Sequence, residues 1–201
     1  MGIPVLILGE SGSGKSTSMR NFSPDEVKIF NVADKSLPFR DKGFDIQKRS
    51  GYRAIVKELS SPKYKRYVID DSQYLMAFES FQKANVTGYQ KFTEMAVHFY
   101  NLIRTAVSTP DDVIVYFLHH IEKEEDGKIK AKTIGKMLDN QLTLEGLFSI
   151  VLLCMNEDGK HFFVTQSDGN TTAKSPMEMF EYTIDNDLKF VDETIREYYG
   201  I

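Results

Sequence analysis

The chain has 201 residues, of which 41% are apolar, and a formal net charge of −4 at pH 7. This length suits one globular domain over residues 1–201, and no apolar run approaches the roughly 18 residues of a membrane span. The single cysteine, Cys154, excludes a disulfide framework, and the first apolar run lacks the features of a signal peptide. The cytoplasm is therefore the expected compartment.

The overall charge conceals a basic segment. Between Lys35 and Arg66 the chain has ten Lys and Arg residues against three Asp and Glu, a local net charge of +7. A basic stretch in an otherwise acidic protein can bind polyanions, although a plain solvated surface has the same composition.

Short apolar strands alternate with amphipathic helices along the chain, which predicts an α/β fold with a mainly parallel sheet. The expected strands are residues 4–8, 27–32, 67–69, 113–118, 147–155 and 161–165. A short helix is expected from about Gly14 to Asn21, whereas the segment 35–62 has no clear pattern. Asp158-Gly159 predicts a hairpin between the last two strands.

Two later segments have the apolar periodicity of helices. The first follows the third strand and has apolar residues at steps of three and four, namely Phe92, Met95, Ala96, Phe99, Leu102, Ile103 and Ala106. The second lies near the C-terminus, with Leu188, Val191, Ile195 and Tyr198. Each pattern predicts a helix with one buried face.

A phosphate-binding loop is the most specific signal. The pattern G-x-x-x-x-G-K-[ST] is matched by Gly9, Glu10, Ser11, Gly12, Ser13, Gly14, Lys15 and Ser16, and Thr17 follows. Glycines let backbone N–H groups approach phosphate oxygens, Lys15 would reach the β- and γ-phosphates, and the Ser16 hydroxyl would ligate Mg²⁺. The loop follows a strand and precedes a helix, so we expect a P-loop protein that binds ATP, or less readily GTP.

Two carboxylates end the third strand, at Asp70 and Asp71. In P-loop enzymes the strand beside the loop ends in a Walker B Asp that holds the Mg²⁺ shell, which predicts that role for Asp70. A helix N-cap at this dipeptide is compatible with it. Asp71, or Asp34 after the second strand, could orient the attacking water.

In this order the motifs resemble the RecA core, and most closely the small RecA-like ATPases of bacteriophages, whose relatives include single-strand annealing and recombination proteins. The segment Phe30-Asn-Val-Ala-Asp34 is similar to the RecA pattern that ends in a water-activating Glu. The resemblance thus implies Asp34 as the general base, with Asp71 as the alternative base. The remaining interpretation is that Asp34 only forms a turn. Full recombinases have additional N- and C-terminal parts, which are not expected in this chain.

The resemblance also implies a phosphate sensor at His120, since RecA-like proteins place a polar sensor at the end of the fourth strand. An imidazole can donate a hydrogen bond to phosphate. A metal site at His119 and His120 is the alternative, but neighbouring strand residues point to opposite faces.

The segment 121–136 follows this position and corresponds to the second DNA loop of RecA-like proteins. Alternate lysines at Lys128, Lys130 and Lys132 suit contact with single-stranded DNA, whereas a mixed-charge hairpin is the competing interpretation. Lys174 lies where RecA-like oligomers carry a basic finger that reaches a neighbouring subunit, which implies self-association; a plain surface lysine is the alternative.

The expected function is therefore Mg²⁺-dependent ATP hydrolysis coupled to single-stranded DNA in recombination. An oligomeric helicase or packaging motor, or a small-molecule or nucleoside kinase, is the alternative. The segment 121–136 lacks the arginine of a kinase lid, and no Asn-Lys-x-Asp motif of a GTPase is present.

Overall fold

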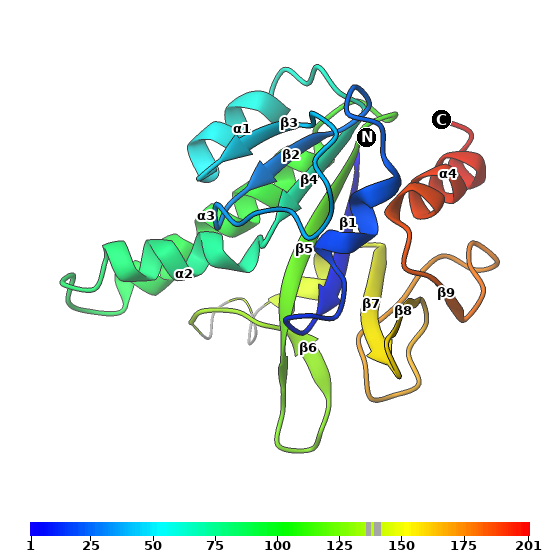
Figure 1. The fold of residues 1–201 in the computed structure, drawn as a ribbon. Helices are drawn as coiled ribbons and strands as arrows, with labels where there is room; N and C mark the ends of the chain where they lie inside the picture. The colour runs from blue at the N-terminus through cyan, green and yellow to red at the C-terminus, as the bar shows by residue number, and fades with distance from the viewer. Residues whose placement is uncertain (136–137, 139–141) are drawn as a thin grey trace.

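A mostly parallel sheet forms the centre of the protein in this computed structural model, which describes residues 1–135, 138 and 142–201 (Figure 1). The strand order is β3-β2-β4-β5-β1-β7-β8-β9, and β6 pairs with β5. The α/β class predicted from the sequence is confirmed. The strands are β1 (Ile3–Gly9), β2 (Lys28–Asn31), β3 (Asp45–Lys48), β4 (Arg66–Asp70), β5 (Ile114–Lys123), β6 (Ile129–Ala131), β7 (Ile150–Glu157), β8 (Lys160–Val164) and β9 (Thr183–Asp185).

Helices cover both faces of the sheet, which gives three layers. The helices are η1 (Ser16–Asn21), α1 (Tyr52–Leu59), α2 (Gln73–Gln82), α3 (Gln90–Val107), η3 (Leu144–Leu147) and α4 (Leu188–Tyr199). Alternate residues of β1 enter different cores, as the period of a strand requires: Leu6 and Leu8 pack with α1, α2 and α3, whereas Val5 and Ile7 pack with η1 and α4. No helix of the described part is long and apolar enough to cross a membrane.

The central strand β1 is parallel to both neighbours, β5 and β7, and is fully buried along residues 5–8. A continuous apolar run suits a strand that is covered on both faces. The sheet becomes antiparallel from β7 onward, and the β7–β8 connection is the two-residue turn predicted at Asp158-Gly159, with φ of 50° and 78°.

The structure adds detail to the sequence expectations in several places. The helix expected from Gly14 is a six-residue 3₁₀ helix, η1, which starts at Ser16. The segment 35–62, unassigned from the sequence, contains β3 and α1. Strand β5 also continues past Leu118 to Lys123, because β6 pairs with its exposed end.

Candidate functional site

The loop Gly9–Ser16 leaves the end of β1 between two parallel neighbours. Gly9 lies opposite His120 of β5 on one side and Cys154 of β7 on the other. Gly12 and Gly14 have φ of 82° and 104°, a conformation that L side chains rarely adopt. Of the two motif glycines, Gly14 therefore has a conformational reason, whereas Gly9 has a steric one, because a Cβ there would lie 2.4 Å from Ser13 Oγ.

Backbone N–H groups of the loop are open to a ligand. Among hydrogen bonds between described residues, no acceptor is found for the amides of Ser11, Gly12, Gly14, Lys15 and Ser16. The buried Ser13 Oγ also lacks a partner. A row of unpaired N–H groups in a tight turn forms an anion-binding concavity, and the six-residue η1 adds little helix dipole to it.

The carbonyl side of the same loop is held by the protein. Cys154 Sγ donates to the Ser13 carbonyl at 3.1 Å, and His161 Nδ1 donates to it at 2.7 Å. Asn186 Nδ2 donates to the Gly14 carbonyl at 3.3 Å. These bonds fix the peptide planes so that the opposite N–H groups face outward. The sequence contained no signal for His161 and Asn186, because the first lies 148 residues from Ser13.

Lys15 is buried, and its ammonium contacts the loop itself. Its Nζ donates to the carbonyls of Gly9 and Glu10, both at 2.8 Å. Burial lowers the pKa of Lys15, and the nearby carboxylates of Asp70 and Asp71 oppose this shift. The charge therefore lies within the loop, close to the unpaired amides.

Asp70 comes to the loop from a distant part of the chain. Ser16 Oγ donates to Asp70 Oδ1 at 2.7 Å, across 54 residues. Burial raises the pKa of Asp70 to about 6, and Asp71 adds to this effect. A hydroxyl and a carboxylate are oxygen ligands of the kind that Mg²⁺ takes, so this pair fits the expected metal role. No group of three or more His, Cys, Asp or Glu in the described chain could hold a metal, so phosphate and water would supply the other ligands.

The strand that ends in Asp70 is not beside the loop strand, contrary to the sequence prediction. Strand β5 lies between β1 and β4 and pairs in parallel with both. This insertion brings His120 directly opposite Gly9. Local sequence patterns do not reveal strand order, because it depends on how the crossovers pack on the sheet.

Asp71 and His120 form a polar pair beside the loop. His120 Nε2 lies 3.1 Å from Asp71 Oδ1, and Lys35 Nζ lies 2.5 Å from Asp71 Oδ2. Burial acts to raise the pKa of Asp71, but the bonds from His120 and Lys35 outweigh it, so this pKa is lowered. Asp71 is thus an ionised acceptor near neutral pH. Tyr74 lies against His120, with ring centroids 5.3 Å apart.

The two adjacent histidines have different environments. His119 is fully buried, with Nε2 2.9 Å from the Lys132 carbonyl and Nδ1 2.9 Å from Ser72 Oγ. A carbonyl oxygen can only accept, so Nε2 carries the proton. Burial lowers the pKa of His119 to about 3, which makes it a neutral structural group.

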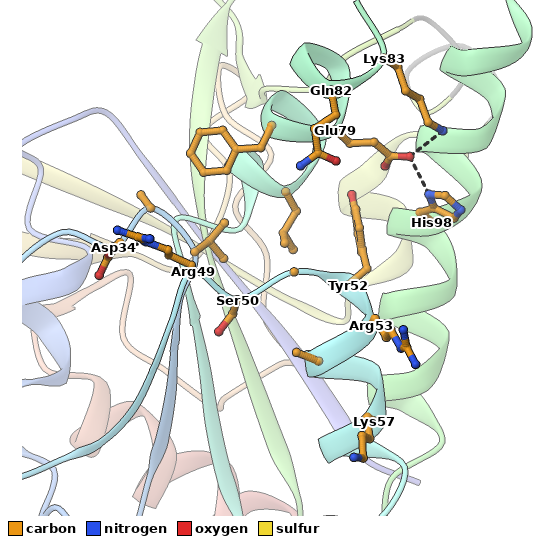
Figure 2. A pocket seen from close by; sticks show the side chains of 16 residues that line it. Asp34, Arg49, Ser50, Tyr52, Arg53, Lys57, Glu79, Gln82, Lys83 and His98 are labelled. Atoms are coloured by element: carbon orange, nitrogen blue, oxygen red, sulfur yellow. Dashed lines mark hydrogen bonds and ion pairs between the residues drawn. The ribbon is translucent and has the colours of Figure 1, made fainter. Parts of the chain in front are cut away.

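Asp34 lies in a turn after β2 with φ of 55°. Its carboxylate accepts from Arg49 Nε at 2.8 Å and lies 3.9 Å from Lys48 Nζ. Lys48 is the last residue of β3, and Arg49 follows it. Asp34 and Arg49 line a cleft between the ends of β2 and β3 and the helices α1 to α3 (Figure 2). Asp34 and Asp71 therefore have separate sets of partners.

The lysine-rich segment is a hairpin of β5 and β6, as the competing interpretation has it. Lys130 Nζ lies 3.2 Å from Glu122 and 3.0 Å from Glu124, and Lys128 and Lys132 are exposed. Lys123, on the same hairpin, pairs with Glu10 of the loop at 2.7 Å. Lys136, the last lysine of the segment, lies outside the described residues.

Lys174 lies beside β7. Its amide and carbonyl each form a 2.8 Å hydrogen bond with the backbone of Val151. Val151 is three residues before Cys154, so this bridge lies below the loop end of the strand. A role of Lys174 in a neighbouring subunit stays a prediction.

In comparisons with known proteins, neither the family models nor the curated proteins include a match to this chain.

Proposed function

We propose that this protein is a P-loop ATPase of RecA-like type, which binds ATP with Mg²⁺ and hydrolyses the γ-phosphate, coupled to single-stranded DNA. The observation that carries the proposal is the combination of five unpaired loop amides with Lys15 and the Ser16–Asp70 hydrogen bond. Each has a counterpart in the chemistry of phosphate binding.

In this proposal, the loop amides bind the phosphate oxygens. The Lys15 ammonium exchanges its hydrogen bonds to the loop carbonyls for contacts with the β- and γ-phosphates. When bound, Mg²⁺ offsets the charge of these phosphates. Ser16 Oγ and the Asp70 carboxylate are the protein groups that would hold it. The preorganised loop lowers the reorganisation needed as charge develops in the transition state.

Asp71 and His120 are the groups best placed to handle the attacking water. The ionised Asp71 carboxylate orients the water and accepts its proton. The water oxygen attacks the γ-phosphorus, and the bond from this phosphorus to the β,γ-bridging oxygen breaks. His120, opposite Gly9, donates to a γ-phosphate oxygen. Asp34, the first choice by resemblance, is the alternative base.

Phosphate release from ATP, with and without single-stranded DNA, tests the proposal against a Lys15→Ala variant. A Lys15-dependent rate that rises several-fold with DNA supports it. A Lys15-dependent rate without a response to DNA removes the DNA-coupled part, and kinase acceptors then become the next test. A rate equal in both proteins contradicts the ATPase assignment.

A further inference from the structure

A large cleft of the described structure is separate from the phosphate loop. It has a volume of about 1310 Å³ and lies between the turns that follow β2 and β3 and the helices α1, α2 and α3. None of the loop residues 9–17 lines it. Its volume exceeds that of most small-molecule pockets, which span roughly 300–1,000 Å³.

Two buried polar atoms in this cleft have no protein partner. Glu79 has a side chain that is 10% exposed, and its Oε1 is bound by Lys83 and His98, both at 2.8 Å. Its Oε2 has no hydrogen bond, and neither has the hydroxyl of Tyr52. In Figure 2 the Tyr52 hydroxyl points toward Glu79. Unpaired buried oxygens cost about 1–3 kcal/mol each unless a ligand satisfies them.

The α1 side of the cleft is basic. Arg53 and Lys57 line it, are exposed, and have no acidic partner in the part of the chain that the structure describes. Both belong to the basic segment between Lys35 and Arg66, but unlike Lys35 neither pairs with a carboxylate of the nucleotide site. Their separation by one helical turn places them on the same face of α1.

Aromatic side chains complete the lining. The rings of Tyr52 and His98 lie 5.7 Å apart, and Phe78, which is 41% exposed, stacks on Tyr74 at 5.4 Å. Exposed aromatic faces beside basic groups are the usual means of binding unpaired bases and the backbone that joins them. A carboxylate oxygen that accepts hydrogen bonds suits the exocyclic amine of cytosine.

We infer that this cleft, rather than the lysine-rich hairpin, is the binding site for single-stranded DNA, with Arg53 and Lys57 on the phosphates and Glu79 Oε2 on a base amine. The inference rests on the proposed function for the partner, but its observations are independent of the phosphate loop. Ring contacts also connect the cleft with the nucleotide site, because Phe78 contacts Tyr74 and Tyr74 contacts His120.

The first experiment measures binding of fluorescent oligodeoxycytidylate by anisotropy over a range of salt concentrations. Arg53→Glu with Lys57→Glu should weaken binding about tenfold. It should also lower the slope of the logarithm of the binding constant against the logarithm of the salt concentration by about 1.4, since each single-strand phosphate contact contributes about 0.7 to that slope. Arg40→Glu with Lys63→Glu is the matched control, because both residues are exposed members of the same basic segment outside the cleft. This control should retain binding.

The second experiment tests base recognition. The full-length protein should bind oligodeoxycytidylate more tightly than oligodeoxythymidylate, and Glu79→Gln should remove most of this preference. Glu94→Gln is the matched control, because Glu94 also accepts from Lys83, at 2.8 Å, but does not line the cleft. Unfolding midpoints verify that each variant is folded.

Three results would overturn the inference. The first is equal loss of binding in the cleft pair and the control pair, which would indicate only long-range charge. The second is loss in Lys128→Glu with Lys132→Glu while the cleft pair binds normally. The third is no DNA binding by a protein that still hydrolyses ATP with Lys15, which would leave the ATPase proposal intact.

Discussion

Ser16 Oγ donates a 2.7 Å hydrogen bond to Asp70 Oδ1, which joins the loop after β1 to the end of β4 although β5 separates the two strands. The pair brings a hydroxyl and a buried carboxylate to the position where a phosphate-bound metal is expected. Its contribution can be tested separately from that of Lys15.

Asp70→Asn should weaken Mg²⁺-dependent nucleotide binding by about 10–100-fold, the usual effect of losing a group that supports a metal. Binding without Mg²⁺ should change little, because the loop amides remain. Titration calorimetry with a non-hydrolysable ATP analogue, with Mg²⁺ or with chelator, measures both. Asp25→Asn, at an exposed position, is the control. Equal Mg²⁺ dependence in all three proteins would contradict the metal role.

Asp71→Asn should reduce kcat by about 100-fold or more, while the KM for ATP changes little, because positioned general bases contribute at this level. Asp34→Asn should leave kcat close to that of the unchanged protein, since Asp34 lines a cleft that none of the loop residues 9–17 lines. Steady-state phosphate release at saturating ATP compares them. A large loss in Asp34→Asn alone would restore the role implied by the RecA resemblance.

His161→Ala should raise the nucleotide dissociation constant by about fivefold, because one hydrogen bond of about 1 kcal/mol no longer holds the Ser13 carbonyl. The loop amides would then spend less time facing the ligand. Asn101→Ala, at an exposed position outside the loop and the cleft, is the control. Unchanged affinity in His161→Ala would show that the remaining bonds suffice.

His119 should make stability depend on pH. Burial lowers its pKa from the ordinary 6.5 to about 3 in the fold, so below pH 6.5 the unfolded chain binds a proton that the native state does not. Stability is therefore fully present above pH 6.5 and is lost as pH falls toward 3, by about 1.4 kcal/mol per unit. The free energy of unfolding can be measured with urea at pH 7.5 and at pH 5.0. Between these two pH values it should fall by about 2 kcal/mol less in His119→Gln than in the unchanged protein. An identical pH dependence in both proteins would contradict a neutral His119.

Patterns contained in short stretches of sequence were sufficient for much of this structure. The apolar run of β1 with the loop after it, the Asp158-Gly159 turn and the apolar face of α3 depend on neighbours a few residues apart. Backbone sterics and the period of burial act at that range, so the fold class follows from them. The motif residues of the loop were likewise identified from spacing alone.

Tertiary structure alone decided which distant groups meet. The position of β5 between β1 and β4, the support of the loop by His161 and Asn186, and the association of the basic α1 with Glu79 depend on how helices pack on the sheet. Such contacts join residues far apart in sequence, and many arrangements share one local pattern. Burial of the whole chain selects among them, so the cleft and its unpaired oxygens follow from the packed structure.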